Sequence, residues 1–216
     1  FDGVFRNCVV MMNGQFVGRH LSGYTSFGFD VTEICLFGED NAVAVFVDAT
    51  DNELWSYEGA GIYRGVRLVK TASVFVPQWG AYVATGDATD PGSVKAEITV
   101  RNSLYTPVEC VVKNEIIAPD GSVAAQAQNP LRILGVDEQT LHWATALDNP
   151  VLWQLDDPQL YTLRITILLD DAAVDVYETA FGVRYFDFDA ETGFSFNGVP
   201  MKLKGVCCHQ DHGGVG

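Results

Sequence analysis

Short runs of alternating apolar and polar residues, separated by turn residues, constrain the fold of this chain more than any other feature. They recur along most of its length, and no stretch between them shows a convincing helical period. A period of two places every second side chain on the same face of a strand. Many short strands joined by Gly-rich connections are typical of sandwiches and jelly rolls, so the sequence predicts an all-β protein.

Four runs account for residues 1–78. CVVMMNGQFVGRH predicts a hairpin that turns at Asn13-Gly14, because Asn and Gly tolerate the positive φ angles of a tight turn. We expect further strands at SFGFDV (26–31) and at the almost continuously apolar NAVAVFVDA (41–49). The last strands of this part are expected within YRGVRLVKTASVFV (63–76).

A domain boundary is predicted between Pro77 and Tyr82, where a strand ending at Val76 meets Pro77 and Gly80. About seven strands are expected over roughly the next hundred residues, with turns such as Pro119-Asp120-Gly121 between them. That number and spacing are typical of an immunoglobulin-like sandwich. The segment lacks the Cys pair that bridges the two sheets of antibody domains, so the similarity is one of architecture.

The C-terminal stretch FSFNGVPMKLKGVCCHQDHGGVG concentrates polar and titratable groups after a strand. A second hairpin is predicted at Asn197-Gly198, with a type I′ turn and a return strand from Val199 to Val206. The residues from Cys207 to His212 follow that strand directly. In a β/α barrel, active-site groups lie at the carboxyl ends of the strands, so this stretch is a candidate site.

Three blocks of the sequence resemble the β-galactosidase and β-glucuronidase family, glycoside hydrolase family 2. NGVPMKLKGVCCHQDHGGVG is similar to the family's entry into its catalytic barrel, and WSYEGAGIYRGVRL (55–68) to a signature in its N-terminal jelly roll. NPVLWQLDDPQLYTLRITI (149–167) is similar to a segment of its middle domain. The resemblance implies part of a jelly-roll sugar-binding domain at 1–78, an immunoglobulin-like domain at 79–187 and the first strand of a TIM barrel at 188–216.

The implied function is that of the ancillary portion of a retaining exo-β-glycosidase, most like a β-galactosidase, with a carbohydrate substrate. Such enzymes need two carboxyl groups flanking the scissile bond. The family carries its two catalytic glutamates beyond the position of residue 216, so the resemblance assigns no catalytic residue to this segment and implies that it is inactive alone. The alternative is a carbohydrate-binding or interaction module without catalytic activity. The strand followed by His209 and a Gly-rich end favours the enzyme.

Four residues are candidates for substrate binding. His209 matches the family's strand-end histidine, which contacts the sugar in relatives. Relatives typically carry Asn-Arg just before that histidine, whereas this chain has Cys207-Cys208. Where relatives place an acidic sugar contact, seven positions before the Ile of the signature, this chain has Trp55, which leaves Asp51, Asn52 and Glu58 as nearby polar alternatives.

Aromatic residues and histidines outside these positions favour structural roles. Trp55, Tyr57 and Tyr63 would fill an interface while Glu58 pairs with Arg64, because aromatic side chains contribute large buried areas wherever they occur. Trp153 and Tyr161 would anchor a Pro-containing loop against the sandwich. His142 lies on an alternating strand, where a structural histidine is commoner than a ligand.

Charge and cysteine usage exclude several classes of partner. The formal net charge is -15 and the pI is about 4.4, which disfavours nucleic acid and anionic membranes. No stretch approaches the roughly 20 apolar residues of a membrane span. The five cysteines show no CxxC spacing, so we expect reduced, mostly buried thiols and neither a zinc site nor a disulfide framework.

No cofactor is expected in this segment. His212 with Asp211 lacks the spacing of a metal site. Divalent cations are used by members of the family, and their ligands would lie mostly downstream. The sequence is compatible with a homo-oligomer, and it leaves localisation open between the cytoplasm and the periplasm or exterior of a bacterium.

Overall fold

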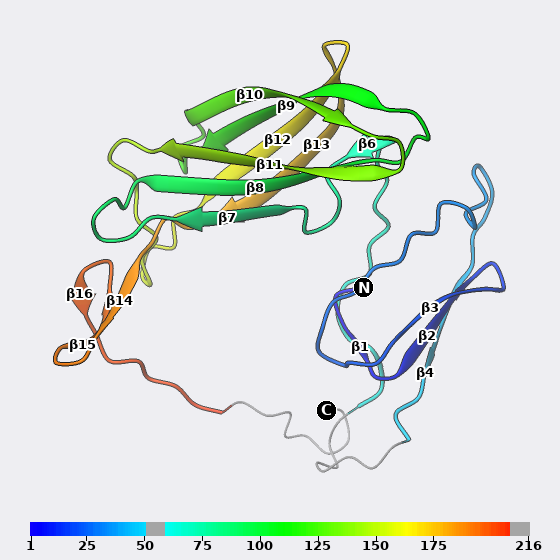
Figure 1. The fold of residues 1–216 in the computed structure, drawn as a ribbon. Coiled ribbons are helices and arrows are strands. Elements are labelled where there is room, and N and C mark those ends of the chain that lie inside the picture. The colour runs from blue at the N-terminus through cyan, green and yellow to red at the C-terminus, as the bar shows by residue number, and fades with distance from the viewer. Residues whose placement is uncertain (51–58, 208–216) are drawn as a thin grey trace. The chain divides into compact units, whose positions relative to one another are not determined.

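The computed structural model describes residues 1–50 and 59–207, and all the regular structure in these residues is β (Figure 1). Every pair of strands is antiparallel, and no helix occurs in the part described. The chain divides into two compact units, one of residues Phe1–Val69 with 205–207 and one of Lys70–Lys204. The prediction of an all-β protein is confirmed.

The larger unit is a sandwich of two sheets. One sheet has the order β11-β8-β6, with β7 also paired to β8, and comprises Asp137–Ala146, Ser93–Asn102, Val74–Phe75 and Ala81–Thr85. The other has the order β10-β9-β12-β13 and comprises Val123–Ile133, Val108–Ile117, Tyr161–Leu169 and Ala172–Phe181. The series of strands predicted after the domain boundary is therefore present, and the last strand of the sandwich ends at Phe181.

Alternation fills the space between the two sheets. In β8 every second residue from Val94 to Val100 is buried, and β12 buries Leu163, Ile165 and Ile167 on the same principle. These residues belong to a single apolar core to which both sheets contribute. β6 takes part, because Val74 and Val76 lie in this core and the Asp175 carboxylate accepts a 2.9 Å hydrogen bond from the Val76 N–H.

The smaller unit is built on a three-stranded sheet of order β3-β2-β4. β2 (Cys8–Met12) and β3 (Gln15–His20) form the predicted hairpin, with φ of 51° at Asn13 and 78° at Gly14. β4 (Val43–Val47) confirms the strand expected in NAVAVFVDA. A short pair, β1 (Val4–Phe5) with β5 (Gly61–Ile62), adds to the unit, and among its described residues Val4, Cys8, Val10 and Phe27 form a buried cluster.

Of the strands predicted for this part, the one at 26–31 is absent and the run 63–76 is confirmed only in part. Residues 26–31 form no strand. Phe27 exchanges two backbone hydrogen bonds with Phe1, and the Val31 carbonyl accepts from the N–H groups of Ile34 and Cys35 in a local turn, so no ladder extends along the segment. Phe27 is held by its ring instead, stacked on Phe1 at 5.0 Å and on His20 at 4.3 Å. The run 63–76 forms a strand only at β6, whose partner is β8 of the sandwich unit.

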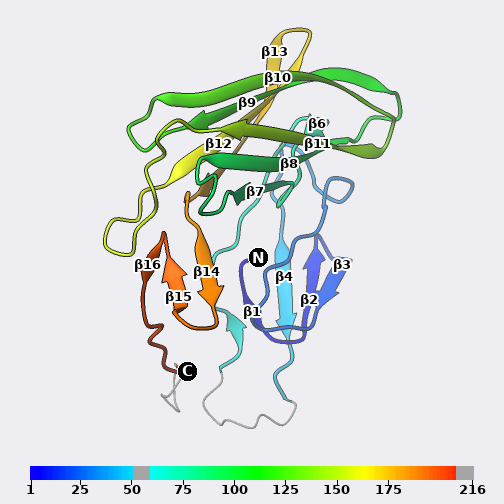
Figure 2. The ribbon, with the colours of Figure 1, turned by 60° about the vertical axis from the view of Figure 1, so that its left-hand side comes forward.

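A second three-stranded sheet, within the larger unit, follows the sandwich (Figure 2). β14 (Phe186–Asp189), β15 (Gly193–Phe196) and β16 (Val199–Pro200) pair in chain order. The predicted turn at Asn197-Gly198 is confirmed by φ of 48° and 78°. The expected return strand is present only at Val199–Pro200. Residues 201–207 form no strand, although the Met201 N–H still donates to the Phe194 carbonyl of β15 at 3.0 Å.

Candidate functional site

Both stretches that carry the predicted substrate-binding residues lie outside the described part of the chain. Asp51, Asn52 and Glu58 fall in residues 51–58, and His209 falls in 208–216. The same holds for Trp55, Tyr57 and Cys208. The geometry of the site is therefore given by the residues that hold the ends of these two stretches.

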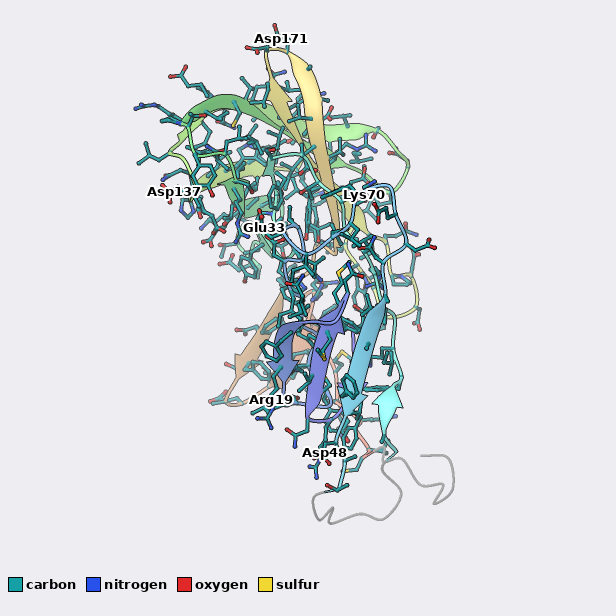
Figure 3. The ribbon with its side chains drawn as sticks, turned by 90° about the vertical axis from the view of Figure 1, so that its right-hand side faces the viewer. Arg19, Glu33, Asp48, Lys70, Asp137 and Asp171 are labelled. Carbon is teal, nitrogen blue, oxygen red and sulfur yellow. The ribbon has the colours of Figure 1, made fainter. Side chains whose placement is uncertain are left out.

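The chain enters the first stretch from the end of β4, where Asp48 forms a compact turn (Figure 3). Its Oδ1 accepts hydrogen bonds from the Thr50 hydroxyl at 2.6 Å and from the Thr50 N–H at 3.1 Å. These bonds favour the ionised carboxylate, so they lower the pKa of Asp48 below its ordinary value. The turn fixes the backbone up to Thr50.

The chain leaves this stretch through β5, and three contacts hold the residues that follow. Gly61 has a φ of 121°, a conformation that suits glycine, and pairs with β1. The Tyr63 hydroxyl donates a 2.7 Å hydrogen bond to the Gly23 carbonyl, and the Arg64 guanidinium lies 5.0 Å from the centre of the Tyr63 ring. Arg67 pairs with Asp2 at 2.7 Å. Tyr63 bonds to the Gly23 backbone and stays 43% exposed, so its filling of an interface remains a prediction, and the predicted pairing of Glu58 with Arg64 lies outside the described residues.

The second stretch is approached through the Asn197-Gly198 turn. The Asn197 side chain donates to the Trp153 carbonyl at 3.0 Å and accepts from the Tyr185 N–H at 3.1 Å. Its backbone N–H donates to the Tyr185 carbonyl at 2.9 Å. Asn197 therefore sets the turn and also attaches the hairpin to two loops of the sandwich.

Trp153 and Tyr161 have the anchoring role predicted for them. The Tyr161 hydroxyl accepts a 2.9 Å hydrogen bond from the Val151 N–H, and its ring stacks on Phe181. Trp153 meets the edge of Phe196 at 5.8 Å. A Cβ at Gly182 would lie 2.9 Å from Trp153, so only glycine fits that approach.

The remaining candidate ligands do not converge. His142 is exposed on β11, with Nδ1 3.8 Å from Glu97 Oε1. Cys8 and Cys110 are buried free thiols whose pKa burial raises, and Cys207 is exposed and free. Within 1–50 and 59–207 there is no cluster of three His, Cys, Asp or Glu residues able to hold a metal ion, and no helix suited to crossing a membrane.

Sequence reasoning singled out neither Asp48 nor the attachment made by Asn197. A signal for Asp48 was available, because Asp two residues before Thr often accepts hydrogen bonds from that residue in a turn. Nothing in the sequence indicates that Asn197 reaches Trp153, because those two residues are 44 positions apart.

The family model described as "Glycosyl hydrolases family 2" matches residues 78–184. Among curated proteins, a β-galactosidase of Bacteroides ovatus is 35% identical over 100% of this chain and 26% of its own length. A β-glucuronidase of Formosa agariphila is 27% identical over 95% of this chain and 23% of its own length. The chain thus spans about a quarter of the length of these relatives.

Solved structures give the same result. The structure of a glycosyl hydrolase family 2 member from Bacteroides cellulosilyticus matches with a TM-score of 0.88 and 29% identity, covering 97% of this chain and 29% of that one. The structure titled as a β-galactosidase from Bacteroides fragilis matches with a TM-score of 0.88 and 26% identity, over 100% of this chain and 34% of that one. The chain therefore belongs to glycosyl hydrolases family 2.

Proposed function

We propose that this chain is the ancillary portion of a retaining exo-β-glycosidase that hydrolyses terminal β-glycosidic bonds, most like a β-galactosidase. One observation carries the proposal: the whole chain aligns at 35% identity with the β-galactosidase of Bacteroides ovatus. On this proposal residues 1–78 are the later part of a jelly-roll sugar-binding domain, 79–187 are an immunoglobulin-like domain, and 188–216 begin the catalytic barrel.

The strand order of the sandwich supports an immunoglobulin-like architecture for the middle domain, to whose first strand β6 adds residues from before position 79. If β6 and β7 are counted together as the first strand, the first, second and fifth strands share one sheet. The third, fourth, sixth and seventh strands share the other. Immunoglobulin-like domains divide seven strands in a similar way, and this order differs from the constant type in that the fourth strand pairs with the third.

The chemistry of the family defines what this chain would contribute. Retaining hydrolysis needs two carboxyl groups roughly 5 to 5.5 Å apart, and the family's glutamates lie beyond residue 216. We assign this chain the binding of substrate, through His209 and through Asp51, Asn52 and Glu58. An imidazole bonded to a sugar hydroxyl lowers the barrier when that bond strengthens in the transition state.

The sugar itself is open to test, because relatives are named both as β-galactosidases and as β-glucuronidases. Galactose is neutral, whereas glucuronate carries a carboxylate that calls for a cationic partner. The four candidate residues include two carboxylic acids and neither Lys nor Arg. That composition favours hydrogen bonds to neutral hydroxyls, and hence a β-galactoside.

Steady-state kinetics of the enzyme that contains this segment test the proposal. The value of kcat/KM on an aryl β-galactoside should exceed that on the matching β-glucuronide, and the 216-residue chain alone should hydrolyse neither. A preference for the glucuronide would overturn the choice of sugar. Absence of hydrolysis of any aryl β-glycoside would overturn the proposed function.

Replacement of His209 tests the assigned role directly. In that enzyme, His209→Ala should lower kcat/KM about a hundredfold, equivalent to roughly 2.7 kcal/mol of transition-state stabilisation, without lowering the Tm. His142→Ala is the matched control, and it should leave the rate on the aryl glycoside unchanged. Equal rates for the wild type and His209→Ala would show that the histidine has no part in the reaction.

A further inference from the structure

On the outer face of the sheet that contains β8, the side chains are arranged in regular rows. Packing of the core does not require the residue types found in these rows. This sheet lies nearest the viewer in Figure 1. Its outward side chains form rows set by the strand register: Phe75–Arg101–Glu138, then Thr99–Thr140 beside Gly80, then Tyr82–Glu97–His142. The first and third rows cross three strands, and the middle row crosses β8 and β11 with Gly80 just before β7.

The middle row has no large side chain. Gly80 accepts a 2.7 Å hydrogen bond from the Thr99 N–H at one end, and the Thr99 and Thr140 hydroxyls lie 3.0 Å apart at the other. Residues two positions apart on a strand are separated by roughly 7 Å, so the flanking rows stand about that far to each side. The Thr99 and Thr140 hydroxyls are therefore flanked on both sides by the larger side chains of the neighbouring rows.

Two exposed aromatic residues lie on either side of Gly80 in the sequence. Tyr82, on β7, is 64% exposed. Trp79, the residue before Gly80, is 63% exposed. Trp79 has a φ of 61° in a turn closed by the Gly80 N–H to the Pro77 carbonyl at 2.8 Å. Glycine is preferred at such a position. Neither conformational preference nor burial within the described residues accounts for a tryptophan at this position.

The charges of this face are balanced, although the chain is strongly acidic. Lys95 and Arg101 are matched by Glu97 and Glu138, and Arg101 pairs with Glu138. The chain as a whole has a net charge of -15. A balanced face with exposed aromatic rings and hydroxyl groups suits a neutral ligand better than a cation or a nucleic acid.

We propose that Trp79, Tyr82, Glu97 and the Thr99–Thr140 pair form an ancillary contact for a neutral β-linked glycan. The apolar faces of the sugar rings would stack on the two aromatic rings, and the hydroxyls would bond to the Glu97 carboxylate and to the threonines. This contact uses none of the residues assigned to substrate binding above. It would hold a polysaccharide chain on the protein and raise the local concentration of chain ends.

Affinity electrophoresis of the 216-residue chain in gels containing soluble β-1,4-galactan tests the contact. The wild type should be retarded by galactan and not by the anionic polygalacturonate. Tyr82→Ala should raise the apparent Kd about tenfold. Trp79→Gly should do the same without lowering the Tm, because glycine relieves the strained turn. Tyr105→Ala, which changes a tyrosine that is 92% exposed on the loop after β8, is the control and should bind as the wild type does.

Three outcomes would overturn the contact: no retardation of the wild type, unchanged retardation of both Tyr82→Ala and Trp79→Gly, or an equal loss in Tyr105→Ala. Retardation abolished by changing Asp51, Asn52 and Glu58 but kept by Tyr82→Ala would also overturn it, while supporting the proposed function. Loss of the proposed hydrolytic activity would leave the electrophoretic result unaffected, so the two proposals fail separately.

Discussion

The sandwich and the smaller unit are made of similarly apolar strands. In the sandwich, two sheets bury their apolar side chains against each other, whereas the described part of the smaller unit has a much smaller core. The sandwich strands β8 to β13 are nine to eleven residues long and share a core of seventeen buried residues. The strands β2 to β4 are five or six residues long. The buried cluster of their unit has four residues in the described part of the chain. The comparison teaches that alternation specifies a strand, whereas a second sheet is needed to turn it into a core.

The largest difference is expected from truncating side chains in the two units. Ile165→Ala, at a fully buried site of the sandwich, should lower the free energy of unfolding by about 3 to 4 kcal/mol, because it removes buried methyl groups and leaves a cavity. Phe46→Ala on β4, where the ring is 60% exposed, should change it by less than about 0.5 kcal/mol. Urea unfolding provides both values, and similar losses would contradict the comparison.

Self-association should distinguish the two units next. Among the described residues β4 is an edge strand paired only to β2, and its Val43 and Phe46 are exposed. Exposed apolar edges favour pairing between chains, so we expect the isolated chain to associate at high concentration. Val43→Lys should shift sedimentation towards monomer, whereas Val176→Lys, on the edge strand β13 of the sandwich, should have a smaller effect. A wild type that stays monomeric would contradict this expectation.

At one position within the sandwich core, a substitution should raise the free energy of unfolding, whereas most core substitutions lower it. Asn114 is fully buried among apolar residues, and its side-chain nitrogen and oxygen have no hydrogen-bond partner in the described part of the molecule. An unpaired buried amide is costly, so Asn114→Leu should raise the free energy of unfolding by about 1 kcal/mol. A loss of stability in urea unfolding would mean that the amide is hydrogen-bonded in solution.

The smallest effect, and one that both units should share, concerns aspartate turns. Hydrogen bonds from Thr50 lower the pKa of Asp48 in the smaller unit, and bonds from Thr89 lower that of Asp87 in the larger one. Because these folded-state pKa values are depressed, the stabilisation is present above the unfolded pKa and is lost as the pH falls through the folded value.

NMR titration of the carboxyl carbons should show Asp48 and Asp87 below the usual range. Thr50→Val should raise the pKa of Asp48 and leave that of Asp87 unchanged. An unshifted Asp48 in the wild type would show that the turn does not persist in solution.

The strands of the sandwich could be predicted from their own alternation. β9 with β10 and β12 with β13 pair as neighbours along the chain, whereas β8 with β11 and β9 with β12 pair across long stretches of sequence. The two Asn-Gly hairpins could likewise be read locally. Residues 26–31 have the same alternation, but Phe27 and Phe29 pack ring against ring and no neighbouring strand is placed to complete a ladder. The partner of β6 could not be predicted locally either. Val74 pairs with Asn102 in the larger unit, whereas the chain up to Val69 belongs to the smaller one.

Prediction of the candidate site reached less far. The family resemblance identified the two stretches, but the residues that fix their ends act through long-range contacts. Tyr63 bonds to Gly23, which is 40 positions away. Such pairs follow from the folded topology and carry no local signature in the sequence.

The two Asn-Gly turns also affect how long the protein keeps its covalent structure. Asparagine followed by glycine is the sequence in which the next backbone nitrogen most readily attacks the side-chain amide, expels ammonia and leaves aspartate or isoaspartate after hydrolysis. At Asn197 this would replace the donor that faces the Trp153 carbonyl with a carboxylate oxygen, turning attraction into repulsion. At Asn13 the same change would remove the donor to Ile34 and Asn41. The Asn-Gly pair that favours each hairpin turn is therefore also the place where deamidation would first weaken the hydrogen bonds that hold the hairpin.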